Sequence, residues 1–267
     1  MSYTVSTLFH VVVAWSFGRV WLWHFSEPAS HLPGAEGFGW FFRYLTFCSY
    51  TIQTALFASS ACLGLALHLS RRGALPTRFR RGREALDALA CAAFPLANTV
   101  SLMFYSIQYA TGALVEGTKN GATRPPWLDF AVHGANSLAA WGDLLVAPDR
   151  SFSRASARLA ALLTLAYALW LVLVRERFGR YPYPVLNAMP AYLGFPGFFG
   201  AGAAVMASTH AMGKGVRTLR RKALDAATEA LRERRGKKLG GHAVWGGVRA
   251  RWAKRADKDA FGGGKDD

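Results

Sequence analysis

The sequence predicts an all-α membrane protein: a polytopic bundle of six transmembrane helices followed by a basic cytosolic C-terminal tail. Three observations lead to this class. The chain of 267 residues is 52% hydrophobic with a mean hydropathy of +0.13, which is too apolar for a disordered basic protein. Its formal net charge of +16 is too basic for an ordinary soluble enzyme. The Lys and Arg residues are gathered between long apolar runs and in the tail, as on the cytosolic face of helical membrane proteins.

Six apolar runs are long enough to cross the hydrocarbon core, which takes about 20 residues of helix. The first run has no basic segment before it and no clean small-residue cleavage site after it, so we interpret it as a retained helix. The second run is over-long, and we expect it to tilt or to project from the membrane. The six runs cover residues 4–25, 40–69, 86–110, 127–147, 156–174 and 183–208.

The distribution of Lys and Arg predicts the orientation of these spans. Arginines are dense at 71–83 after span two and at 150–158 after span four, and sixteen basic residues lie within 214–265. With six spans these three regions share one side, so we expect that side and both termini to be cytosolic. The arginines at 175–180 argue mildly against it. The predicted location is therefore a multi-pass position in an endomembrane or the plasma membrane.

The composition changes after residue 210. Apolar residues recur at helical spacing among Lys and Arg over 211–239, which predicts an amphipathic helix against anionic lipid headgroups, with a solvated cytosolic helix as the open alternative. Gly and charged residues dominate 240–267 and predict disorder. We therefore divide the chain into a six-helix transmembrane domain over 1–210, the basic helix and the disordered tail. Topology and anionic lipid explain the basic segments, so we expect no nucleic-acid partner.

Polar side chains recur at helical spacing within three of the spans, where lipid makes them costly unless they face protein or a cavity. Each set falls on one helix face, so we expect the three faces to point inward and to enclose one polar cavity. The open alternative is that Ser, Thr and Asn only join neighbouring helices through hydrogen bonds. The sets are Thr46, Ser49, Tyr50, Gln53 and Thr54; Asn98, Ser101, Tyr105 and either Gln108 or Tyr109; and Asp129, His133, Asn136 and Ser137.

Thr46 and His133 have the clearest chemical use among these residues. Spans two and four both enter from the non-cytosolic side, and the two residues lie about five and six residues into their spans. At about 1.5 Å per residue, both lie roughly 8–9 Å below that surface. If the helices are neighbours, the hydroxyl and the imidazole can act as nucleophile and general base. Asp129, one turn before His133, either holds the imidazole's tautomer or stabilises its cation, or else lies solvated among the headgroups.

Further polar residues are candidates for binding or orienting a substrate. Arg43, three residues before Thr46, either attracts a carboxylate or extends to the interface as a membrane-surface cation. No HExxH motif and no cluster of carboxylates with His occurs in the sequence, so we expect neither a metal nor another cofactor. Several side chains could stabilise an oxyanion, and the sequence does not choose among them. These are Asn98, Ser101, Tyr105, Asn136 and Asn187.

Three blocks of sequence, in the same order and at similar spacing, resemble a known family. The stretch RYLTF at 43–47, followed by Gln53, is similar to the family's KYLTF…Q start of span two. The stretch PWLD at 126–129 with His133 is similar to its P-x-W-L-N-H-x-x-H opening of span four. The stretch FGRYPYP at 178–184 is similar to its G-x-W-x-Y-P entry to span six. The family is that of the androgen-inducible and androgen-dependent TFPI-regulating proteins.

The resemblance covers roughly residues 5–210 and implies an activity. The family comprises multi-pass membrane hydrolases of fatty acid esters of hydroxy fatty acids, with a threonine nucleophile and a histidine. Carried over residue by residue, these roles fall on Thr46 and His133. The chain departs from the family pattern at Asp129, where the family has Asn, and at Phe130, where it has a second His. These departures leave the pair intact and bear on substrate preference.

The preferred prediction is therefore an intramembrane lipid ester hydrolase whose partners are membrane lipids and its substrate, with no obligate protein partner inferred. One alternative is a b-type haem electron carrier, since His10 and His24 lie 14 residues apart, about 21 Å along a helix. His68 and His133 are alone on their spans, which disfavours paired haem ligation. Another alternative is a non-catalytic lipid-binding or transport protein. Its usual signs, internal symmetry or several intramembrane charges, are missing from the sequence.

Overall fold

The computed structural model describes residues 3–70, 77–111, 125–147 and 150–261, and these residues form helices and turns with no strand. The chain divides into two compact units, residues 1–217 and 218–267. The long helices of the first unit are α1 (Tyr3–Trp23), α3 (Leu45–Leu69), α4 (Thr77–Thr111), α6 (Ala135–Val146), α7 (Arg154–Phe178) and the first part of α9 (Ala191–Phe261). The predicted all-α class is confirmed.

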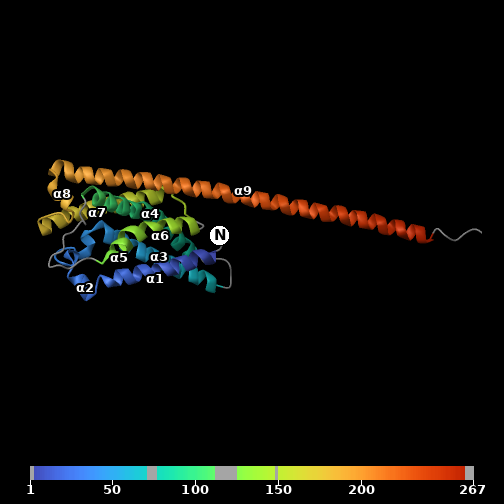
Figure 1. Ribbon diagram of the computed structural model, residues 1–267, viewed down its shortest axis with the longest axis horizontal. Coiled ribbons are helices and arrows are strands. Elements are labelled where there is room, and N and C mark those ends of the chain that lie inside the picture. Colours follow the sequence, from blue (N-terminus) through green and yellow to red (C-terminus); the bar gives the residue numbers. More distant parts are fainter. Residues whose placement is uncertain (1–2, 71–76, 112–124, 148–149, 262–267) are drawn as a thin grey trace, which may run out of the picture. The chain divides into compact units, whose positions relative to one another are not determined.

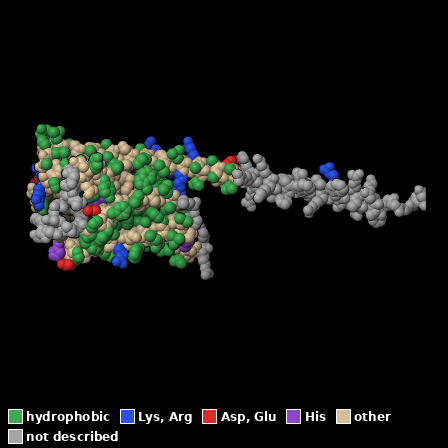
Figure 2. Space-filling view, viewed as in Figure 1, with side chains coloured by type: hydrophobic (Ala, Val, Ile, Leu, Met, Phe, Trp, Pro, Cys, Tyr) green, Lys and Arg blue, Asp and Glu red, His purple; other side chains and the backbone are tan. Residues whose placement is uncertain are grey.

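The long helices of the first unit lie side by side, and successive ones run in opposite directions (Figure 1). Helix α4 is the central one, because 67% of its apolar stretch is buried against 22% for α1 and for α7. The outer helices turn large apolar side chains outward, and hydrophobic side chains cover much of the face shown in Figure 2. An apolar outer surface suits contact with lipid tails and not with water.

Four helices among the described residues are long and apolar enough to cross a membrane, which indicates an integral membrane protein. They are Tyr3–Trp23, Leu45–Leu69, Phe79–Ala110 and Arg154–Phe178. The fourth predicted span is divided into α5 (Pro126–Asp129), the π-helical turn η4 (Phe130–Gly134) and α6. The sixth begins with the short helix α8 (Pro184–Ala188) before α9 starts. Six spans, and the orientation of the termini, therefore remain a proposal.

The second span begins later than the sequence suggested. Trp40–Arg43 form a 3₁₀ turn (η2), preceded by Gly39 in the left-handed region with φ +87°. Tyr44 is extended and caps the next helix, so α3 begins at Leu45 and has 25 residues. The expectation of an over-long helix that starts at residue 40 was therefore wrong. The physical reason is the turn at Gly39, whose left-handed backbone conformation interrupts the helix before Leu45. Residues with a side chain rarely adopt that conformation.

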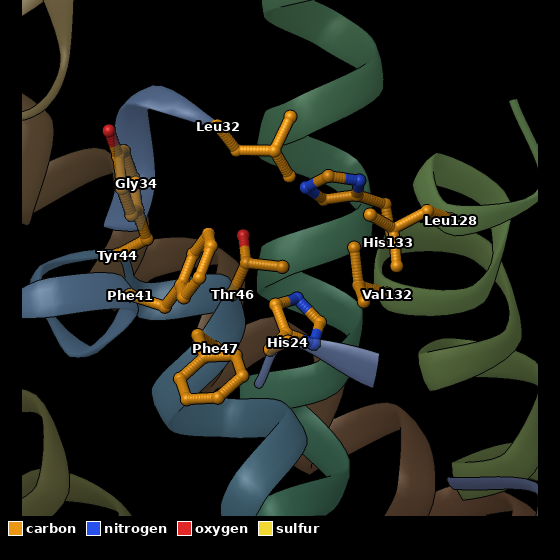
Figure 3. Close-up of a pocket in the computed structure, with 10 residues that line it drawn as sticks. All are labelled: His24, Leu32, Gly34, Phe41, Tyr44, Thr46, Phe47, Leu128, Val132 and His133. Carbon is orange, nitrogen blue, oxygen red and sulfur yellow. The ribbon is translucent and has the colours of Figure 1, made fainter. Parts of the chain in front are cut away.

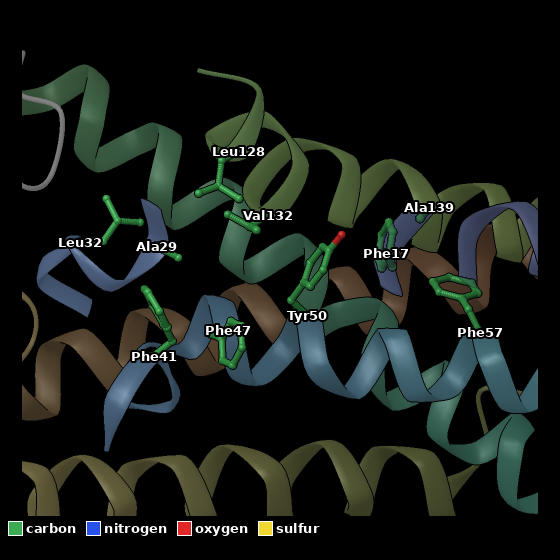
Figure 4. Close-up of a cluster of buried hydrophobic side chains, with 10 residues drawn as sticks. All are labelled: Phe17, Ala29, Leu32, Phe41, Phe47, Tyr50, Phe57, Leu128, Val132 and Ala139. Atoms are coloured by element: carbon green, nitrogen blue, oxygen red, sulfur yellow. The ribbon is translucent and has the colours of Figure 1, made fainter. Parts of the chain in front are cut away.

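One cluster of buried hydrophobic side chains positions the site. It lies where α1 packs against α3 and the α5–η4 segment (Figure 4). The ring of Phe17 on α1 stacks on Tyr50 of α3, with 4.5 Å between centroids and 17° between planes. Leu128 and Val132 are buried in the same cluster and bring the α5–η4 segment onto α3. The ends of these three segments are thereby held together, and the candidate site lies among them.

The second unit is helical over most of its described length. Helix α9 continues to Phe261, through most of the segment 240–267 that we expected to be disordered. The Ala, Lys and Arg residues of this segment favour helix, and the compositional prediction gave more weight to its glycines. Residues 262–267 lie outside the described residues. The predicted domain boundaries and the lipid contact of 211–239 remain predictions.

Candidate functional site

A pocket lies at the end of the first unit where α1 ends and α3 begins (Figure 3). It has a free volume of about 70 Å³. Thr46 of α3 and His133 of η4 both line it, so the structure brings together the two residues on which the predicted chemistry depends. The remaining lining is mostly apolar and aromatic, and consists of His24, Leu32, Gly34, Phe41, Tyr44, Phe47, Leu128 and Val132.

Thr46 is the second residue of α3, and its position gives the pocket a positive electrostatic end. The capping residue, Tyr44, accepts no side-chain hydrogen bond from the first turn. The Leu45 N–H donates to the hydroxyl of Tyr183 at 2.8 Å, whereas the Thr46 N–H has no acceptor among the residues that the structure describes. The first amides of a helix and its macrodipole stabilise negative charge. An anion that forms at Thr46 is therefore favoured here.

The imidazole of His133 is held in one tautomer. Its Nδ1 lies 3.0 Å from the backbone carbonyl oxygen of Asp129, which can only accept a hydrogen bond. The hydrogen therefore lies on Nδ1, and Nε2 carries the lone pair that a base needs. The Asp129 carboxylate lies 3.9 Å from the same Nδ1. It is close enough to stabilise an imidazolium, one of the roles that the sequence left open.

Two residues of α4 fix the position of His133. The ring of Phe104 stacks on the imidazole with 3.4 Å between centroids and 5° between planes. The hydroxyl of Ser101 donates to the backbone carbonyl of His133. That carbonyl belongs to the π-helical turn, and π-turns are frequent at functional sites because they redirect a side chain. Ser101 therefore contacts the site through the backbone of His133, and Phe104 was not foreseen from the sequence.

Several of the other polar residues of the three predicted faces are buried between helices, and none of the others lines the pocket with Thr46 and His133. Asn98 accepts hydrogen bonds from Ser137 at 2.7 Å and Trp141 at 2.9 Å, so it joins α4 to α6. Asn136, one turn after His133, is fully buried, and neither atom of its amide has a hydrogen-bond partner. Tyr105 is 43% exposed and is not among the residues that line the pocket.

Arg43 and Asn187 have structural partners outside the pocket lining. Arg43 is buried, and its guanidinium donates to the carbonyls of Pro33 and Glu36 in the loop between α1 and α3. These loop carbonyls hold its guanidinium, and a contact of Arg43 with a substrate carboxylate remains a prediction. The amide of Asn187 accepts from Tyr181 N–H at 2.9 Å and donates to the same residue's carbonyl, which shapes the loop before α9.

Sequence reasoning missed His24 as a pocket residue. It follows the last residue of α1, is 6% exposed and lines the pocket with Thr46. The signal was available, because two antiparallel helices joined by a loop place the end of the first beside the start of the second. His24 was considered only as a haem ligand, with His10 as the ligand of a second haem on the same helix. His10 Nε2 lies 2.7 Å from the carboxylate of Asp143, so that nitrogen has a protein partner and nothing in the fold favours the haem alternative.

A buried charged cluster farther along the first unit was also missed. Arg150 donates to both carboxylate oxygens of Asp143 at 2.6 Å, and Asp87 lies 3.9 Å from the same guanidinium. Burial is the largest single effect and acts to lower the pKa of Arg150, but the charge and hydrogen bonds of Asp143, together with the nearby Cys91 and Asp87, raise the pKa overall. Among the described residues, no group of three or more His, Cys, Asp and Glu side chains is placed to hold a metal ion.

Comparison with known proteins gives one match. Residues 5–218 match the family described as FAR-17a/AIG1-like protein, which covers most of the first unit and both residues of the predicted pair. The resemblance to the androgen-inducible proteins is thereby confirmed. The comparison with curated proteins and the comparison with solved structures gave no match.

Proposed function

Because the chain belongs to the FAR-17a/AIG1-like family, we propose that it hydrolyses lipid esters within the membrane, with fatty acid esters of hydroxy fatty acids as the substrate class. The family suggests a membrane hydrolase-related function. The observation that carries the proposal is the single pocket lined by both Thr46 and His133. A hydroxyl and an imidazole base that share a largely apolar pocket suit acyl transfer.

In the proposed reaction, Nε2 of His133 takes the proton of the Thr46 hydroxyl as its oxygen attacks the ester carbonyl carbon. The bond from that carbon to the alcohol oxygen then breaks, and the leaving alkoxide takes the proton from His133. The acyl group remains on Thr46. Water attacks this acyl group, the fatty acid leaves and the proton returns to the Thr46 oxygen. Nothing beyond the ester and one water molecule is consumed.

Three features of the pocket support this chemistry. The Thr46 N–H, at the positive end of a 25-residue helix, is available to stabilise the oxyanion of the tetrahedral intermediate. The hydrogen bond from Nδ1 to the Asp129 carbonyl leaves Nε2 of His133 as the basic nitrogen. The apolar lining, from Leu32, Leu128 and other side chains, suits an acyl chain. The long chains of such an ester can lie in the surrounding lipid.

The test is hydrolysis of a branched fatty acid ester of a hydroxy fatty acid by the purified protein in detergent, with a fluorophosphonate label read in parallel. We expect Thr46→Ala to lose both turnover and labelling, because the attacking oxygen is gone. We expect His133→Ala and His133→Gln to lower kcat by about 10²–10⁴-fold, the usual contribution of a general base. Each variant is compared with wild type for its elution profile and Tm.

Matched controls make the result specific. Thr54→Ala removes a hydroxyl that donates only to the carbonyl of Tyr50 one turn earlier on the same helix. His68→Gln removes an exposed histidine near the other end of α3. Both should keep wild-type turnover. If wild type, the three site variants and the two control variants all behaved alike, the result would contradict the catalytic proposal and would favour a pocket that binds lipid without turnover.

A further inference from the structure

His24 is a second histidine in the same pocket, and its position relative to Thr46 sets it apart from the other lining residues. It comes from the end of α1, whereas His133 comes from η4, and in Figure 3 the two rings lie on different sides of the Thr46 side chain. Both rings are buried, at 6% and 4% exposure. A reacting group on Thr46 is thus bordered by two imidazoles.

The two imidazoles are held in the same tautomer by the same kind of contact. Nδ1 of His24 lies 2.9 Å from the carbonyl oxygen of Val20, four residues earlier, as Nδ1 of His133 lies 3.0 Å from that of Asp129. A carbonyl oxygen accepts only, so the hydrogen of His24 is also on Nδ1. In its neutral form His24 therefore has a lone pair on Nε2. In that state it can take a proton and has none to give from that nitrogen.

The surroundings of the two rings differ in a way that separates their roles. His133 has the carboxylate of Asp129 at 3.9 Å, which suits a residue that is charged while the alkoxide leaves. His24 packs edge to face or tilted against Phe41 and Phe47, with centroids 4.8 and 4.7 Å away. His133 also stacks on Phe104, so the nearby Asp129 carboxylate is what sets it apart. The aromatic surroundings of His24 suit a base that is neutral before it acts on an uncharged nucleophile.

We propose that His24 is the catalytic base for deacylation, the step in which water releases the acyl group from Thr46. Nε2 of His24 takes one proton of the water as its oxygen bonds to the acyl carbon. The bond from that carbon to the Thr46 oxygen breaks and the carboxylic acid leaves. His24 then returns the proton to the Thr46 oxygen, which restores the hydroxyl. This inference rests on the proposed ester hydrolysis and adds a residue to it.

The test uses His24→Asn in the full-length protein. The Asn side chain places an N–H close to the position of Nδ1, so it can keep the hydrogen bond to the Val20 carbonyl, but it has no basic nitrogen at the position of Nε2. A chromogenic fatty acid ester is mixed rapidly with the protein, and release of the alcohol is followed. We expect a burst of about one equivalent, as acylation proceeds, and then a steady state about 100-fold slower than wild type.

Two further measurements distinguish a lost base from a damaged fold. Mass spectrometry should find an acyl adduct on Thr46 in His24→Asn, and fluorophosphonate labelling should keep its wild-type rate. Hydroxylamine, which attacks the acyl group without needing a base, should restore turnover in the variant and form the hydroxamate. His24→Gln serves as a second variant if His24→Asn does not fold. His31→Gln is the control, since His31 is exposed in the following turn and pairs with Glu27 at 2.8 Å.

The outcomes separate this inference from the proposed function. Wild-type steady-state turnover in a folded His24 variant, with no acyl adduct, overturns the inference and leaves the Thr46–His133 proposal standing. Loss of the burst and of labelling in a folded variant also overturns it, because His24 would then act before or during acylation. Absence of turnover and labelling in wild type overturns both.

Discussion

The carboxylate of Asp143 receives hydrogen bonds from Arg150, and His10 contacts the same group at 2.7 Å. All three side chains are buried. Removing one member of a buried ion pair leaves the other charge desolvated and uncompensated, which costs far more than the net value of the pair. This cluster therefore joins α1, α6 and the segment before α7, and removal of one charge of the Asp143–Arg150 pair should be destabilising.

Asp143→Asn tests that dependence. We expect it to lower the free energy of unfolding by roughly 3–5 kcal/mol, because the Arg150 guanidinium keeps its charge and loses its hydrogen-bonded counterion, with Asp87 left at 3.9 Å. Thermal unfolding in detergent measures the change. The matched control is Glu84→Gln, whose partner Arg80 lies 3.9 Å away with both side chains about 70% exposed. Exposed pairs contribute about 0–1 kcal/mol, so the control should change little.

A double variant checks the origin of the expected destabilisation. Adding Arg150→Gln to Asp143→Asn removes the orphaned charge and should recover part of the loss, as a double-mutant cycle would show. An Asp143→Asn protein as stable as wild type would contradict the argument that this charge pair is coupled to folding.

At the scale of the element, the π-helical turn Phe130–Gly134 determines where His133 points. Sequence periodicity placed His133 on the same helix face as Asp129 and Asn136. That prediction assumed that the fourth span, residues 127–147, is one regular helix. A π-turn has hydrogen bonds between residues five apart, where an α-helix has them between residues four apart. The extra residue rotates the side chains after the turn relative to those before it. The hydroxyl of Ser101 on the neighbouring helix is bonded to the carbonyl of His133 within this turn.

Ser101→Ala tests whether that contact positions the base. We expect kcat and the rate of fluorophosphonate labelling to fall by about 10-fold with KM unchanged, because a small displacement of the imidazole weakens proton transfer but not lipid binding. Ser101→Thr keeps the hydroxyl and should restore the rate. Ser106→Ala, an exposed serine on the same helix, is the control. Equal changes in kcat and KM, or no rescue by Thr, would argue for a merely structural role.

Much of the element structure could be predicted from the sequence, and the exceptions have physical reasons. Apolar runs of about 20 residues predict membrane helices because hydrocarbon thickness sets their length, and α1, α3 and α7 follow this closely. The start of α3 was predicted five residues early, because hydropathy does not indicate backbone conformation and so gave no sign of the left-handed turn at Gly39. Hydropathy is equally blind to a π-turn inside an apolar segment, so the division of the fourth span was not foreseen.

The candidate site was predictable in part for a different reason. Thr46 and His133 were found because each lies on the polar face of an otherwise apolar span and near the entry of that span. Whether such residues meet depends on which helices are neighbours, which no periodicity gives. The roles of Arg43 and Asp143 depend on how short loops fold back over the helix ends, and loop geometry leaves little trace in residue type. Their partners could be identified only from the fold.

At the scale of the whole molecule, the proposed six spans require both termini on one side of the membrane. The test is a protease-protection assay on sealed membranes with an epitope tag at each terminus. We expect both tags to be cleaved from the cytosolic side, because the basic regions at 71–83, 150–158 and 214–265 favour that side. Tags on opposite sides would require an odd number of spans and would contradict the proposal. Tags that are both protected would keep the even number and reverse the orientation.

The pocket lies at the end of the first unit where α1 ends and α3 begins, and the arginines at 79–83 and 150–158 lie at the other end (Figure 1). If the basic end faces the cytosol, the reacting hydroxyl belongs to the opposite leaflet. An ester made in the cytosolic leaflet must then cross the bilayer before it is cleaved, and both acids are released on the far side. Sidedness would make transbilayer movement of the ester, and not its total amount in the membrane, the quantity that sets how much substrate the protein receives.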